Sequence, residues 1–241
     1  MHIPRASRDE ADTETQHGAD AGRVVPRTGV WLVWALSGLG VTLGVLAFIY
    51  GVLNYDSLNA LLTRVALQAV WAMSFPLVGA VIAIHRPRNP LGWIFLVVGL
   101  SEGLVVFGYE YASYVFRTAP GTATGGGLAV WMSHWAWAPG LLLTFVPLLF
   151  PDGRLPSRRW RPVAWLSAIP IMVIPVSTAV ALWPWRGPAL LDPGTVQQGM
   201  GDLGVLNFAP YILMMACGLA CLTALLLRFR RARGIQRQQL K

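Results

Sequence analysis

Charged residues are scarce in this chain. Asp, Glu, Lys and Arg together make up 12% of its 241 residues, about half of the roughly 25% found in an average soluble domain. Hydrophobic residues make up 55%. This balance argues against a soluble fold and favours a protein that lies largely within a membrane.

Cysteine is also scarce. Cys217 and Cys221 are the only two, and they are four residues apart in an apolar stretch near the end of the chain. Small residues surround them, so we interpret both as packing residues on a helix. They give no evidence of disulfides, and a metal site would need further ligands nearby.

Motifs for catalysis and for nucleotide binding are missing. The sequence has no Walker A pattern, no dinucleotide-binding glycine pattern, and no H-E-x-x-H, C-x-x-C or G-x-S-x-G motif. Asp152 stands in Phe150-Pro151-Asp152-Gly153, where proline, aspartate and glycine have the order of a tight turn. We therefore predict no catalytic, cofactor-binding or metal-binding residue, and no cofactor.

Six long apolar runs dominate the sequence. Each has about the 20 residues that a helix needs to cross the ~30 Å hydrocarbon layer. A spanning segment must satisfy its own backbone groups in lipid, so these runs are helices rather than strands. The predicted fold class is therefore all-α, a polytopic membrane helix bundle with six transmembrane helices. The runs are Val30–Val52, Val65–Ile84, Leu91–Tyr114, Leu128–Phe150, Val163–Trp183 and Val205–Leu227.

The gaps that separate the runs are alternately rich and poor in basic residues. On one side are 16 of the 19 Lys and Arg residues, and on the other are Arg64, Arg117 and Arg186. Short basic loops stay in the cytoplasm, so both termini are predicted to be cytoplasmic in a multi-pass protein of the cell (inner or plasma) membrane. The net charge of +8 then indicates an anionic inner leaflet as a partner, and no nucleic acid. The sixteen are Arg5, Arg8, Arg23, Arg27, Arg86, Arg88, Arg154, Arg158, Arg159, Arg161, Arg228, Arg230, Arg231, Arg233, Arg237 and Lys241.

These patterns divide the chain into three parts. Residues 1–28 are polar and are predicted to form a disordered cytoplasmic arm. Acidic residues in this arm and the length of the following apolar run argue against a signal peptide. Residues 29–228 form the six-helix transmembrane domain, and residues 229–241 form a basic cytoplasmic juxtamembrane tail. The loop 184–204 is rich in Pro, Gly and Gln and is too short for a periplasmic sensor domain.

Glycine spacing and proline placement bear on helix packing. The first run contains Gly40-x3-Gly44 and the third contains Gly99-x3-Gly103, a spacing that lets helix backbones approach closely. It supports packing and says little about dimerisation. Prolines also interrupt the second, fourth and fifth runs, where they act as static bends or as hinges.

Three titratable residues are candidate intramembrane polar or sensing groups. Glu102 lies about 16 Å along its helix from Leu91, near the bilayer centre, so we expect it to face the bundle interior or to be protonated. Glu110 and His134 meet at similar depth if the third and fourth helices pack as an antiparallel hairpin. The alternatives are a structural hydrogen bond for Glu102 and an interfacial aromatic belt around the other two.

Three stretches carry a resemblance. They are Arg88–Trp93, Leu149–Pro162 and Arg228–Lys241. In this order and spacing the chain resembles, over about residues 29–241, the N-terminal multi-span membrane region of sensor histidine kinases of the actinobacterial and Chloroflexi type. The resemblance implies an integral membrane sensor or input module of a two-component system. It also makes the basic tail a candidate signal-coupling element with Arg228, Arg230, Arg231, Arg233 and Arg237.

The kinase part of that family does not match. A dimerising phosphoacceptor helix and an ATP-binding domain follow the membrane region there, and this chain stops at Lys241. None of its four histidines lies on a suitable soluble helix, so no kinase activity is expected from it. It is either a fragment or a stand-alone module. A homodimer, a cytoplasmic kinase module and a response regulator are the candidate protein partners.

Two other functions are compatible with the sequence. A small secondary transporter would have internal repeats and paired broken helices, and no convincing three-plus-three repeat is visible. An integral-membrane enzyme would be built around Glu102, Glu110 and His134, although the spans carry few polar groups.

Overall fold

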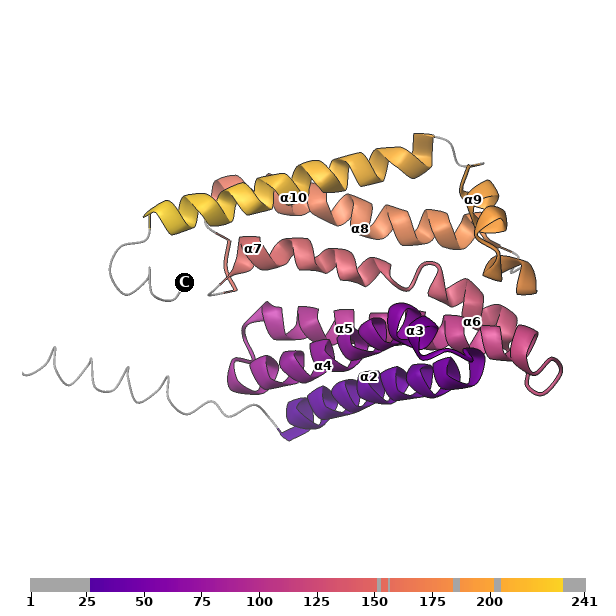
Figure 1. Cartoon of the computed structure of the whole chain (residues 1–241). Coiled ribbons are helices and arrows are strands. Elements are labelled where there is room, and N and C mark those ends of the chain that lie inside the picture. The colour runs from indigo at the N-terminus through magenta and orange to yellow at the C-terminus, as the bar shows by residue number, and fades with distance from the viewer. Residues whose placement is uncertain (1–26, 151–152, 156, 184–186, 202–204, 232–241) are drawn as a thin grey trace, which may run out of the picture.

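The computed structural model describes residues 27–150, 153–155, 157–183, 187–201 and 205–231, and within these ranges every element is helical (Figure 1). Five helices are long and apolar enough to cross a membrane, which is the architecture of a multi-pass membrane protein. The predicted disordered arm lies outside the described residues except for Arg27 and Thr28, which are helical. The five helices are Gly29–Asn54, Leu58–His85, Pro90–Thr118, Arg158–Ala181 and Phe208–Leu227.

The N-terminal half forms a three-helix group of α2, α4 and α5, which pack closely on one another. The helix α2 is Arg27–Asn54, α4 is Leu67–His85 and α5 is Pro90–Ser113. Two short helical elements, α3 (Leu58–Leu61) and η1 (Leu62–Ala66), lead into α4. A further turn, η2 (Tyr114–Thr118), extends α5. The predicted second span therefore begins at Leu58, and Arg64 belongs to a helical turn rather than to a loop.

Proline and glycine explain how closely these helices approach. The Pro76 ring is buried inside α4 and points at α2 and α5. A Cβ atom at Gly99 would lie 2.1 Å from Pro76 Cδ, and one at Gly40 would lie 3.0 Å from Pro76 Cγ. Both glycine-x3-glycine motifs are thus used inside the chain, because Gly44 and Gly103 also face the neighbouring helices of the group. Pro76 therefore lies within a continuous α4 and does not end it, and its ring stays buried.

The hairpin between α4 and α5 begins with a capped turn. The Asn89 side chain accepts a hydrogen bond from Leu91 N at 3.0 Å, and Pro90 occupies the first turn of α5. Gly92 then lies against the backbone of Ala83. Across the bundle, the Gly153 turn lies against Asn89 and Pro90, so two of the three stretches that carried the resemblance are in contact.

The predicted fourth span, Leu128–Phe150, is not one continuous α-helix. It consists of α6 (Gly126–Ser133), a turn, the 3-10 helix η3 (Ala138–Thr144) and the short α7 (Phe145–Leu149). Pro139 lies in the first turn of the 3-10 stretch and Pro147 lies in α7, and neither can donate the backbone hydrogen bond of a regular helix. We refer to Gly126–Leu149 as the broken segment. It runs the length of the bundle between the three-helix group and the remaining helices (Figure 1).

The C-terminal half forms a pair of α8 (Arg161–Ala181) and α10 (Val205–Arg231). The 3-10 turn η4 (Arg158–Trp160) leads into α8. Leu148 of the broken segment, Cys221 and Ala224 share a buried cluster at the contact with this pair. Both cysteines are free and buried, as expected for packing residues. The helix α10 runs three residues beyond the predicted end of the transmembrane domain, to Arg231.

The two ends of the bundle differ in charge. At one end, α2 begins, α10 ends, and seven arginines whose side chains are described gather; we refer to it as the arginine end. At the opposite α9 end, Arg64 and Arg117 are the described basic residues. Between the ends, large apolar side chains face outward, for example Trp31, Trp165 and Ile212. The seven are Arg86, Arg88, Arg154, Arg158, Arg159, Arg161 and Arg230.

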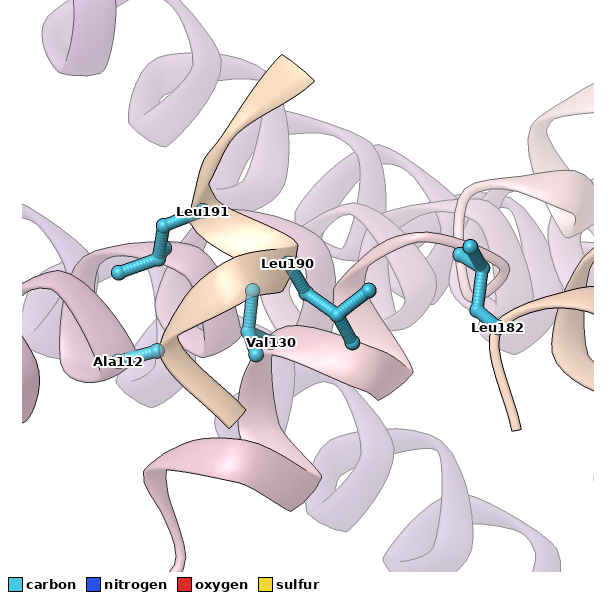
Figure 2. Close-up of a cluster of buried hydrophobic side chains, with 5 residues drawn as sticks. All are labelled: Ala112, Val130, Leu182, Leu190 and Leu191. Carbon is cyan, nitrogen blue, oxygen red and sulfur yellow. The ribbon is translucent and has the colours of Figure 1, made fainter. Parts of the chain in front are cut away.

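A helical cap closes the α9 end. It consists of η5 (Gly187–Leu191) and α9 (Pro193–Gly201). Leu190 and Leu191 of η5 are buried against Ala112 of α5, Val130 of α6 and Leu182 (Figure 2). The loop 184–204 therefore contributes two large side chains to the core, although its sequence has no hydrophobic periodicity.

Candidate functional site

Glu110 is the most deeply buried charged side chain among the described residues, with 3% of its surface exposed. It lies on α5 near the α9 end. Asn54, the last residue of α2, donates one hydrogen bond to Glu110 Oε2 and another to the Glu110 backbone oxygen, each at 2.8 Å. Thr118 in turn donates to Asn54 Oδ1 at 2.7 Å. Asn54 thus bridges the end of α2 to Glu110 in the last turn of α5 and to Thr118 at the end of η2.

Tyr55 completes this network from the turn between α2 and α3. Its hydroxyl donates to Glu110 Oε1 at 3.4 Å, so both carboxyl oxygens of Glu110 accept hydrogen bonds. Partial burial and the neighbouring Glu110 raise the pKa of Tyr55 to about 12, so the phenol stays protonated and remains a donor. A carboxyl group that accepts at both oxygens matches the acceptor geometry of a carboxylate.

A pocket of about 380 Å³ opens beside Glu110. Its wall comes from η1, α4, α5 and α6, and it lies at the contact of the three-helix group with the broken segment. This volume is at the lower end of the roughly 300–1,000 Å³ of small-molecule sites. The polar side chains on its wall are Tyr55, Thr63, Arg64, Gln68, Tyr109, Glu110, Ser133 and His134.

His134 lies on the wall of the same pocket, at the end of α6. Its Nδ1 atom is 2.6 Å from the Val130 backbone oxygen. A carbonyl oxygen can only accept, so Nδ1 carries the proton and Nε2 is the acceptor of the neutral ring. The structure therefore brings Glu110 and His134 to one pocket, as the antiparallel hairpin of the third and fourth segments requires.

A second pocket of about 280 Å³ shares Tyr109 and His134 with the first. Its other side chains come from the cap, including Leu190, Leu191 and Val196. The cap is held over it from η2, because Arg117 donates a hydrogen bond to the Leu191 backbone oxygen at 3.0 Å.

The cap has its own helix start. Asp192 accepts hydrogen bonds from the backbone N–H of Thr195 at 2.9 Å and from its hydroxyl at 3.1 Å. These bonds hold the pKa of Asp192 below its usual range, the backbone hydrogen bond being the larger cause. The carboxylate therefore caps α9 at neutral pH.

Glu102 lies apart from this site, about two helical turns along α5 towards the arginine end. It faces the bundle interior, where a methyl group on Gly140 of η3 would lie 3.4 Å from Glu102 Oε1. Glu102 belongs to the span Pro90–Thr118, where half of the residues in the most apolar stretch are buried. The corresponding share is 22% in the spans of α8 and α10, so the α5 span is the most enclosed of the five. No side chain within the described ranges donates a hydrogen bond to Glu102.

The predicted coupling tail is only partly described. Arg228, Arg230 and Arg231 lie on the last turns of α10, while Arg233 and Arg237 lie outside the described residues. Among His, Cys, Asp and Glu in the described ranges, no group of three is arranged to hold a metal ion.

Sequence reasoning missed Asn54, Tyr55 and Arg64 as members of the site. Asn54 and Tyr55 are 56 and 55 residues from Glu110 in sequence. The available signal was the polar run Asn54-Tyr55-Asp56 at the end of the first apolar stretch. Comparison with protein-family models, with curated proteins and with solved structures finds no match to this chain.

Proposed function

We propose that this chain is the membrane-embedded input module of a signalling protein, of the kind that precedes the kinase in sensor histidine kinases. The observation that carries the proposal is the polar pocket at the α9 end, which contains the buried Glu110 and lies against a broken segment that runs to the opposite end. A stimulus received in this pocket acts on the broken segment through His134. The basic arginine end then delivers the change to a partner.

The broken segment contacts every part that such a signal has to reach. Its α6 and η3 parts pack on α5, and η3 also packs on α8. Its α7 part packs on α10, where Leu148 lies beside Cys221. A change in the pocket wall therefore has a continuous packed route to the helix that ends in Arg228, Arg230 and Arg231.

In this proposal the chain crosses the membrane six times and both termini are cytoplasmic. The broken segment is the sixth crossing, in addition to the five long helices. It is enclosed by neighbouring helices, which is where irregular backbone is tolerated at membrane depth. The 16-to-3 division of basic residues supports a cytoplasmic arginine end.

Reporter fusions test this topology. A reporter at Lys241 should give a cytoplasmic signal, and a reporter at Gly125, between η2 and α6, should give an external one. A cytoplasmic signal at Gly125 would exclude a crossing by the broken segment in the proposed orientation.

The partners of this module are the anionic inner leaflet and a cytoplasmic kinase module or response regulator. A homodimer would bring two arginine ends together, as a dimeric kinase requires. The module itself carries no phosphotransfer activity in this proposal, so purified protein incubated with labelled ATP should stay unlabelled.

Distance measurements test the coupling between the two ends. Spin labels at Arg159 and Arg230, with Cys217 and Cys221 replaced by alanine, report the position of η4 against the end of α10. Replacing His134 by glutamine in the pocket should shift the distance distribution between the labels. The matched control is Asp56→Asn, an exposed residue beside the pocket, which should leave it unchanged. Identical distributions in both variants would refute the coupling.

A secondary transporter is the second candidate, and the broken segment favours it. Discontinuous helices form the substrate and ion sites of such proteins, and Glu102 lies beside Gly140 in the discontinuous part. Proteoliposomes loaded with a pH-sensitive dye separate the two functions. Proton flux that is lost in Glu102→Gln supports the transporter, whereas a pH-tight vesicle with responsive spin labels supports the input module.

A further inference from the structure

We propose that the pocket beside Glu110 binds a small zwitterion, a molecule that carries one carboxylate and one ammonium group. In this arrangement Arg64 binds the carboxylate and Glu110 binds the ammonium. The inference rests on the proposed function, because it names the class of molecule that the input module receives.

The pocket presents one cation and one anion that are not paired with each other. Arg64 is exposed on η1 and Glu110 is buried on α5, and both line the pocket. Both belong to the described residues, yet no ion pair within 4.0 Å joins them. Because both residues line the same pocket, a ligand with both charges can neutralise the two together.

Each charge retains capacity for a ligand. The Glu110 carboxylate accepts one hydrogen bond at each oxygen, from Asn54 and Tyr55, and a carboxylate has about four acceptor sites. The guanidinium of Arg64 has five N–H donors in a planar fork that matches a carboxylate. A ligand with only one charge would leave the opposite protein charge unsatisfied.

The other groups on the wall suit the same ligand. Nε2 of neutral His134 is an acceptor, because its Nδ1 proton is used by Val130. Gln68 adds an amide donor on the α4 side, whereas the Thr63 hydroxyl donates to the Asn59 backbone oxygen and offers the pocket an acceptor. The Tyr109 ring and the apolar second pocket, lined by Leu190, give an apolar substituent a place to pack.

Binding to the full chain in lipid nanodiscs tests the proposal. The probes are four zwitterions, namely glycine, β-alanine, γ-aminobutyrate and L-leucine. Each is paired with its amide, which lacks the carboxylate, and its N-acetyl form, which lacks the ammonium. Calorimetric titration should show that at least one zwitterion binds, and that its amide and N-acetyl forms bind about tenfold more weakly or worse.

Substitutions then assign the two charges. Arg64→Gln and Glu110→Gln should each weaken binding of that zwitterion by about tenfold or more. The matched controls Arg159→Gln, at the arginine end, and Asp56→Asn, outside the pocket, should bind as the unaltered chain does. Arg64 is exposed, so Arg64→Gln remains informative if Glu110→Gln fails to fold.

Two outcomes would overturn the inference. One is that none of the four zwitterions binds to the unaltered chain, and the other is that binding survives both Arg64→Gln and Glu110→Gln. Failure of the proposed function looks different, because zwitterion binding would then persist while the distance between labels at Arg159 and Arg230 stays fixed in His134→Gln.

Discussion

Replacing Gly99 by alanine should loosen the three-helix group at its closest point. The added Cβ would lie 2.1 Å from Pro76 Cδ and 2.5 Å from Pro76 N. The first distance is about 1.3 Å short of a 3.4 Å van der Waals contact, and the second involves backbone. Neither a rotamer change nor a flexible side chain can relieve it, so α4 and α5 must separate.

The magnitude follows from comparison with a glycine in open surroundings. Overpacking of this kind costs about 1–3 kcal/mol, and contact with backbone places Gly99→Ala in the upper part of that range. A Cβ at Gly38 on α2 would meet nothing within 4 Å. Gly38→Ala should therefore gain up to about 1 kcal/mol from helix propensity. The two variants should differ in unfolding free energy by about 3 kcal/mol.

Unfolding in detergent micelles, followed by far-UV circular dichroism, measures this difference. Adding Pro76→Ala to Gly99→Ala should recover part of the loss, because it removes the ring that the new methyl group meets. A double-mutant cycle then gives the coupling between the two positions. Equal stability of Gly99→Ala and Gly38→Ala would refute the close approach.

Three further perturbations have expected outcomes. Asn54→Ala should lower the unfolding free energy by about 1–3 kcal/mol, since it leaves Oε2 and the backbone oxygen of buried Glu110 without the Asn54 donor, and equal stability in the same assay would contradict this. Because the pKa of Asp192 is lowered in the folded protein, its cap on α9 should persist above about pH 4 and be lost as pH falls through the lowered value. The protection factor of the Thr195 amide against hydrogen exchange should therefore fall in acid and in Asp192→Ala at neutral pH, and an unchanged protection factor would exclude the cap. Glu102→Lys should reduce the folded fraction through an insertion penalty of about 2.5–3.5 kcal/mol, whereas Glu102→Gln should insert normally, as membrane fractionation would measure.

The long helices could be predicted from hydrophobicity alone, because span length is imposed by the bilayer. Five of the six predicted runs are helices long and apolar enough to cross a membrane. The run around Leu128–Phe150 is the exception. Its apolar content is sufficient for a membrane span, but Pro139 and Pro147 remove backbone hydrogen bonds. A hydropathy profile does not report backbone hydrogen bonding.

The site could be predicted only in part. Glu102 and Glu110 drew attention because charge is rare in an apolar run, and their helix was correctly assigned. The donors Asn54 and Tyr55 come from another helix terminus, and sequence spacing carries no information about that contact. The packed cap was also missed, since Leu190 and Leu191 are the only adjacent large apolar residues in a loop dominated by proline and glycine.

The 3-10 helix Ala138–Thr144 is longer than an α-helix with the same number of residues. Its seven residues rise about 2.0 Å each, against about 1.5 Å in an α-helix, so rewinding them as α-helix would shorten the segment by about 3.5 Å. The same change, from three to about 3.6 residues per turn, would rotate one end against the other by about 140°. Such a screw motion would draw Leu148 along the surface of α10 and turn it away from Cys221. A local change in winding at mid-membrane is thus geometrically equivalent to a displacement at the arginine end.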